Sequence, residues 1–150
     1  MKTMFLRSVV ARSIVASAGV VALLTMAPAA FAATETYVAE LKAASEVPPN
    51  DSAGAGTLIA TYDTTTKKFS YSVSYAGLTG PATAAHFHGP AAAGANAGVA
   101  VPVKDAASPI KADATLTDAQ AADLQAGKWY FNVHTEKNKG GEIRGQLTKK

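Results

Sequence analysis

The alternation of large apolar residues with small polar ones over residues 69–75 constrains the fold of this chain most. Phe69, Tyr71, Val73 and Tyr75 are separated from one another by single serine residues. Successive side chains of a β-strand point to opposite faces, so this spacing places the large apolar groups on one face and the hydroxyls on the other. The pattern predicts a strand with one buried and one wet face, which is typical of antiparallel sheets.

Further short strands are expected on both sides of this segment, separated by glycine, proline and asparagine. They are predicted over residues 36–42, 56–62, 83–88, 99–103, 128–135 and 141–147. The only helix signal is Thr117, a suitable N-cap, followed by residues 119–125 and by Gly127 as a C-terminal stop. The segment before Thr117 is interpreted as a proline-containing linker. The expected fold is all-β, a Greek-key antiparallel β-sandwich with one short helix.

Residues 1–32 have the features of a secretory signal peptide. Basic residues Lys2, Arg7 and Arg12 precede an apolar stretch over residues 14–26, and Ala30-Phe31-Ala32 forms a small-x-small cleavage site. We expect cleavage to leave one domain, residues 33–150, in a secreted or periplasmic location. Retention of residues 1–32 as an uncleaved anchor is the alternative.

Charge and sulfur content narrow the classes of partner. Three of the 14 Lys and Arg residues fall in the signal segment, so 11 remain against 11 Asp and Glu, and the mature domain is formally neutral. Nucleic acid and anionic membranes are therefore not expected as partners. The chain has no cysteine, and its methionines, Met1, Met4 and Met26, all precede residue 33. The mature domain offers no sulfur ligand, which excludes a blue-copper site.

All three histidines lie in two strand-like motifs. His86 and His88 are two residues apart on one predicted strand and share a face, and His134 lies on the polar side of another. Three imidazoles suit one Cu(II) or Zn(II) ion, so the three residues form a candidate metal site. The hypothesis requires His134 to lie beside the pair in space. The alternative is that these histidines are packing residues, hydrogen-bonded to the backbone.

Glu142 and Arg144 are expected to project to one side of the last strand, near His134. The carboxylate could orient a ligating imidazole through its second nitrogen, and the arginine could attract an anion to a metal. The alternative for this pair is a cross-strand ion pair on the surface. Catalytic motifs such as a Gly-x-Ser-x-Gly elbow, a phosphate loop or a His-Glu-x-x-His helix do not occur in the sequence, so enzymatic activity is not favoured.

Several motifs of the mature chain together resemble one family. They are Glu46-Val47-Pro48-Pro49, Ala85-His86-Phe87-His88-Gly89, Trp129-Tyr130-Phe131-Asn132-Val133-His134-Thr135 and Gly141-Glu142-Ile143-Arg144-Gly145-Gln146-Leu147. In this order, between about Tyr37 and Leu147, they are similar to the CHRD domain, the module named after chordin that also occurs in exported bacterial proteins. The resemblance implies an extracellular or periplasmic β-sandwich module whose biochemical activity is poorly defined.

The motif His86-Phe87-His88-Gly89 also resembles, more weakly, the His-x-His strand of copper-zinc superoxide dismutases. Those enzymes use further histidines and an aspartate, and this chain has no fourth histidine, so a two-metal site is not expected. The sandwich is accordingly expected to be immunoglobulin-like or superoxide-dismutase-like. The leading hypothesis is a non-enzymatic, exported binding module for an extracellular or periplasmic protein or metal ion. A copper-only dismutase-like enzyme, with Arg144 steering the anion, and a purely structural protein-contact module are the alternatives.

Overall fold

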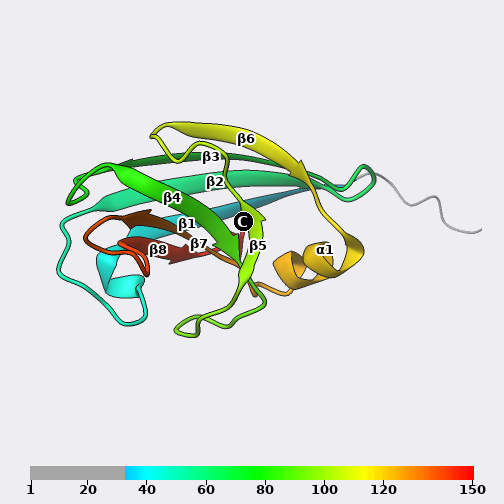
Figure 1. The fold of residues 1–150 in the computed structure, drawn as a ribbon. Helices are drawn as coiled ribbons and strands as arrows, with labels where there is room; N and C mark the ends of the chain where they lie inside the picture. The colour runs from blue at the N-terminus through cyan, green and yellow to red at the C-terminus, as the bar shows by residue number, and fades with distance from the viewer. Residues whose placement is uncertain (1–32) are drawn as a thin grey trace, which may run out of the picture. The chain divides into compact units, whose positions relative to one another are not determined.

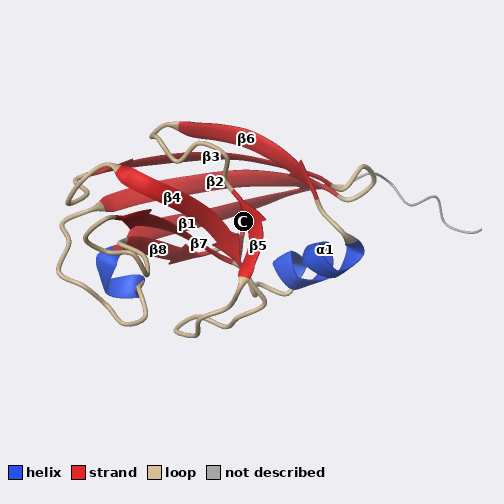
Figure 2. Ribbon diagram, viewed as in Figure 1, coloured by secondary structure: helices blue, strands red, loops and turns tan. Residues whose placement is uncertain are grey.

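The computed structural model describes residues 33–150, and the predicted signal peptide lies outside the described residues. Strands dominate this part of the chain (Figure 2). In chain order the elements are β1 (Thr34–Lys42), the 3₁₀ helix η1 (Ala43–Ser45), β2 (Ala55–Asp63), β3 (Lys68–Ala76), β4 (Ala82–His88), β5 (Val99–Pro102), β6 (Ile110–Thr115), α1 (Asp118–Gln125), β7 (Tyr130–Thr135), β8 (Ile143–Gln146) and β9 (Thr148–Lys149). The predicted antiparallel all-β class with one short α-helix is confirmed.

The strands form one sheet in the order β5-β4-β7-β8-β1-β2-β3-β6, with β9 paired to β1 (Figure 1). Strand β1 joins the two halves, because it pairs along its whole length with β2 and through Lys42 with Arg144 of β8. The sheet folds over so that the two halves face each other. Phe69 of β3 and Phe87 of β4 meet edge to face, with ring centroids 5.1 Å apart.

The core between the two halves comes from the alternating residues that the sequence indicated. Phe69 and Val73 have no exposed surface, and the rings of Phe87 and Trp129 lie 5.9 Å apart in the same cluster. Among residues 33–150, all core residues fall between Tyr37 and Leu147. Because this core lies wholly within residues 33–150, we expect residues 33–150 to fold without the segment before them.

Of the two edge strands of the sheet, β5 was predicted from the sequence and β6 was not. Strand β5 lies at an edge, as Pro102 indicated, because proline cannot donate a hydrogen bond to a second neighbour. Strand β6 at the other edge was missed, since residues 104–116 were interpreted as a linker. In β6, Lys111 and Asp113 are exposed and alternate with apolar residues. Two of these apolar residues are the small Ala112 and Ala114, so the period-two signal is weak.

The helix was predicted correctly from its caps. The Thr117 side chain accepts from the backbone N–H of Gln120 while the Gln120 side chain accepts from the backbone N–H of Thr117, which makes a complete capping box. Gln120 also donates to the carbonyl of Ala100, so α1 lies beside β5 (Figure 2). Within residues 33–150, no helix has the length and apolar character needed to cross a membrane.

Candidate metal centre

The three histidines lie side by side on two neighbouring strands. His86 and His88 on β4 share the face opposite the buried ring of Phe87, and β4 pairs with β7, whose His134 aligns with Ala84. The ring of His86 lies 5.0 Å from that of His134 and 5.5 Å from that of His88 between centroids. One nitrogen from each ring lies within 4.8 Å of the others, so the three residues could hold a metal ion. The required proximity of His134 to the pair is found.

Backbone carbonyls fix the tautomers of two of these rings. Nδ1 of His88 lies 2.9 Å from the carbonyl oxygen of Ala97, and Nδ1 of His134 lies 2.9 Å from that of Lys139. A carbonyl oxygen only accepts hydrogen bonds, so both Nδ1 atoms carry the proton and both Nε2 atoms carry a lone pair. This is the arrangement in which outer partners hold metal-ligating histidines.

The Nε2 atoms of His134 and His88 have different surroundings. Nε2 of His134 lies 3.1 Å from Nδ1 of partly exposed His86, which can donate to it when no metal is bound. Nε2 of His88 is buried and has no hydrogen-bond partner. A buried acceptor without a partner costs free energy, so the position of His88 needs an explanation beyond packing.

Burial and mutual repulsion favour the neutral forms of His86 and His134. Burial lowers the pKa of His86, and the nearby rings of His134 and His88 lower it further. Burial also lowers the pKa of His134, although its hydrogen bond to Lys139 opposes the shift. Neutral imidazole is the form that ligates a metal, so both shifts extend the pH range over which the rings can bind one.

Arg144 and Tyr130 form a stack on His88. The rings of His88 and Tyr130 are parallel within 3°, with centroids 4.8 Å apart, and the guanidinium carbon of Arg144 lies 3.3 Å from the centre of the Tyr130 ring. The guanidinium donates to the side-chain oxygen of Asn96 at 2.8 Å and to the carbonyl of Ala95 at 2.5 Å. Arg144 is only 2% exposed, so it is not placed to draw an anion from solvent.

Glu142 is buried but does not orient an imidazole. Its carboxylate accepts hydrogen bonds from the Ser52 hydroxyl, from the N–H and hydroxyl of Thr79, and from the Thr135 hydroxyl. The expected surface ion pair with Arg144 is wrong as well, since neither residue is exposed. The reason is that Glu142 precedes the regular part of β8 and lies at the end of the core, where two loops meet the sheet.

Two further buried polar residues, Asn132 and Glu46, lie near the histidines. Asn132 was not singled out from the sequence, and Glu46 entered only as part of the Glu46-Val47-Pro48-Pro49 motif. Asn132 pairs with His86 on one side and with Arg144 on the other, and it is 2% exposed. Glu46, on the loop after η1, is 5% exposed, and Oε1 of Glu46 and Oδ1 of Asn132 lack hydrogen-bond partners. Burial raises the pKa of Glu46 to about 7, although Arg144 and Asn132 oppose this. The period-two alternation around His134 was the signal that could have found Asn132.

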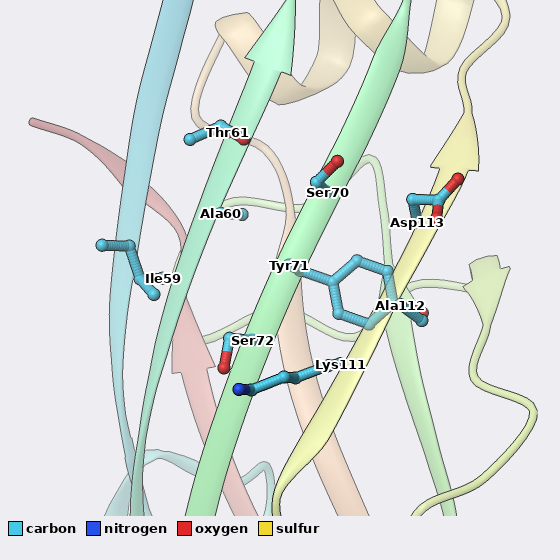
Figure 3. A pocket seen from close by; sticks show the side chains of 9 residues that line it. All are labelled: Ile59, Ala60, Thr61, Ser70, Tyr71, Ser72, Lys111, Ala112 and Asp113. Carbon is cyan, nitrogen blue, oxygen red and sulfur yellow. The ribbon is translucent and has the colours of Figure 1, made fainter.

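A hollow of about 510 Å³ lies elsewhere, over the outer face of β2, β3 and β6 (Figure 3). Its wall includes the side chains of Ile59 and Lys111 and the hydroxyls of Ser70 and Ser72, and none of the three histidines. It is the wet face that the serine alternation predicted. It contains no group of three candidate metal ligands, because the one such group within residues 33–150 is the histidine cluster.

Comparison with known proteins gives one match. A family model described as the CHRD domain matches residues 37–147. No curated protein and no solved structure matches the chain. The match begins within β1, ends just after β8, and therefore includes all three histidines.

Proposed function

We propose that this chain, which belongs to the CHRD domain family, is an exported, non-enzymatic binding module that holds one Cu(II) or Zn(II) ion on His86, His88 and His134. Export as a secreted or periplasmic protein follows from the signal-like residues 1–32. A periplasmic or extracellular metal ion is then the partner, and an extracellular or periplasmic protein would be a second partner of the same module.

The observation that carries the proposal is the state of His88. Its Nδ1 is occupied by a carbonyl, and its Nε2 is buried without a partner beside two other imidazoles. A metal ion at this point would satisfy that atom and would replace the hydrogen bond between His86 and His134 by two metal–nitrogen bonds. No sulfur ligand is available, and three imidazoles with an open position suit Cu(II) or Zn(II).

Calorimetric titration of residues 33–150, purified without a histidine tag, tests the proposal. We expect one-to-one binding of Cu(II) or Zn(II) at micromolar metal, and we expect His88→Gln to abolish it while the fold is retained. Thr83→Ala, an exposed change on the same strand, is the matched control and should bind as the wild type does. Absence of one-to-one binding by the wild type would exclude the metal site.

The same preparation separates the module from a copper-only dismutase-like enzyme. The enzyme alternative gave Arg144 the task of steering the anion, and the burial of Arg144 removes that support. We expect the copper-loaded protein to be inactive in a superoxide assay. Export is tested by expressing the full chain in a bacterial host: the N-terminus of the exported protein should be Ala33.

A further inference from the structure

A short segment of the loop between β4 and β5, residues 95–97, lies on the polar face beside the histidines and is held there by side chains of β7 and β8. Arg144 donates to the carbonyl of Ala95 and to the side chain of Asn96. The Tyr130 hydroxyl accepts from the N–H of Ala97 at 3.2 Å and lies 3.3 Å from its carbonyl oxygen. Segment 95–97 is therefore fixed from two strands at once.

The carbonyl of Ala97 is also the acceptor that holds His88. Nδ1 of His88 donates to it at 2.9 Å, so the position of this carbonyl decides which ring nitrogen keeps the proton. The ring of His88 is in addition stacked flat on Tyr130, which in turn is covered by the guanidinium of Arg144. Both the rotation and the tautomer of His88 thus depend on the same two residues.

A role limited to loop packing does not account well for Arg144. Its two hydrogen-bond acceptors, the carbonyl of Ala95 and the amide oxygen of Asn96, are neutral, and the side chain is 2% exposed. The carboxyl group of Glu46 interacts with this charge, but within residues 33–150 it forms no direct ion pair with the guanidinium. A buried charge held by neutral acceptors costs free energy that an apolar side chain of similar length would avoid. The guanidinium holds two oxygen atoms of segment 95–97 by hydrogen bonds, and an apolar side chain could not donate these bonds.

We propose that Tyr130 and Arg144 are positioning residues of the metal site, which hold the ring of His88 in the orientation and the tautomer that present Nε2 to the metal. This inference rests on the proposed function. The two residues do not ligate the metal; they act through Ala97 and through the stack. Removal of outer partners of this kind lowers metal affinity about 10- to 100-fold.

The test uses residues 33–150 and three variants on the same polar face. Tyr130→Phe keeps the stacked ring and removes the hydroxyl, and Arg144→Met removes the guanidinium and keeps the chain length. Gln146→Met is the matched control, because Gln146 donates to the carbonyl of Ala91 in the same loop but not to segment 95–97. Two quantities are measured: the dissociation constant for Cu(II), by competition titration, and the tautomer of His88 in the metal-free protein, from its ring ¹⁵N shifts.

We expect Tyr130→Phe and Arg144→Met each to weaken Cu(II) binding about 10- to 100-fold and to convert His88 from a single Nδ1–H tautomer to a mixture. Gln146→Met should change neither quantity. Unchanged affinity and tautomer in Tyr130→Phe, the variant least able to disturb folding, would overturn the inference, as would equal effects from Gln146→Met. Failure of the wild type to bind Cu(II) would instead overturn the proposed function, so the two failures are distinguishable.

Discussion

Glu142 and Glu46 are both buried glutamates near the β7–β8 hairpin, yet their surroundings shift their pKa values in opposite directions. Burial alone would raise the pKa of Glu142, but hydrogen bonds from Ser52, Thr135 and Thr79 outweigh it and lower the pKa to about 2. Glu46 has an oxygen without a partner, and its burial raises the pKa to about 7. Hydrogen-bond donors, and not burial, therefore decide whether a carboxylate stabilises this fold as an anion.

Replacing Glu142 by glutamine should destabilise the protein by about 3 kcal/mol at pH 7, because several donors lose a charged acceptor. Since the pKa of Glu142 is lower in the folded than in the unfolded state, its contribution is complete above 4.5 and is lost as pH falls toward 2. The difference between wild type and Glu142→Gln in urea unfolding should therefore shrink with acidification. Exposed Glu136→Gln is the control and should change little; a small, pH-independent effect at Glu142 would contradict the prediction.

Cu(II) affinity should fall as pH is lowered, because protons compete for the imidazole nitrogens. Burial lowers the pKa of His86 and of His134 below the usual 6.5, so the fall should begin at a lower pH than for free imidazole. Titration calorimetry at pH 5, 6, 7 and 8 checks this. An affinity that does not change over this range would show that other groups bind the metal.

The pairing of β4 with β7 creates the candidate site, and this pairing could not be predicted from the sequence. Period two placed His86 and His88 on one face and His134 on a polar face, and both assignments are found in the structure. The two strands are separated by β5, β6 and α1, so their pairing depends on how the whole sheet folds over. No local sequence pattern indicates which distant strands become neighbours in the sheet.

Dependence on tertiary contacts also explains why strand β6 and the burial of Glu142 and Arg144 were not predicted. Strand β6 has a small apolar face and gains its place by pairing with β3, which local propensity does not reveal. Glu142 and Arg144 were assigned to the surface because charged residues usually lie there. Segment 43–54 supplies a hydrogen-bond donor to Glu142, and loop 89–98 supplies the acceptors of Arg144. The paths of these loops are set by tertiary contacts.

The loop between β4 and β5 begins at a glycine that packing requires. A Cβ at Gly89 would lie 2.5 Å from Cδ1 of Trp129 and 2.9 Å from the carbonyl of Lys128, whereas a Cβ at Gly98 would meet nothing within 4 Å. We expect Gly89→Ala to destabilise the protein by about 1–3 kcal/mol in thermal or urea unfolding, since the Trp129 ring must shift. Gly98→Ala, at the other end of the same loop, should stay within about 0.5 kcal/mol of the wild type. Equal effects of the two changes would refute this.

At the scale of the whole domain, the pH dependence of stability should come from a few buried groups. Residues 33–150 carry 11 basic and 11 acidic residues, so self-repulsion through net charge is small near neutral pH. His86 and His134 have lowered pKa values, so their contribution to the stability of the folded state is complete above pH 6.5 and is lost as pH falls below it. Glu46 has a raised pKa and acts in the opposite direction over a similar range.

The variant Glu46→Gln measures the contribution of Glu46 to the pH dependence of stability. Because the pKa of Glu46 rises from 4.5 in the unfolded chain to about 7 in the fold, its contribution is complete below pH 4.5 and is lost as pH rises through 7. The variant cannot ionise, so it should match the wild type near pH 5 and exceed it by about 2 kcal/mol near pH 8. Urea unfolding of metal-free protein at both values measures this, with exposed Glu40→Gln as the control whose difference from the wild type should not vary. If the advantage of Glu46→Gln were the same at pH 5 and pH 8, the carboxylate would already be charged at the lower pH, and the desolvation argument for its raised pKa would fail.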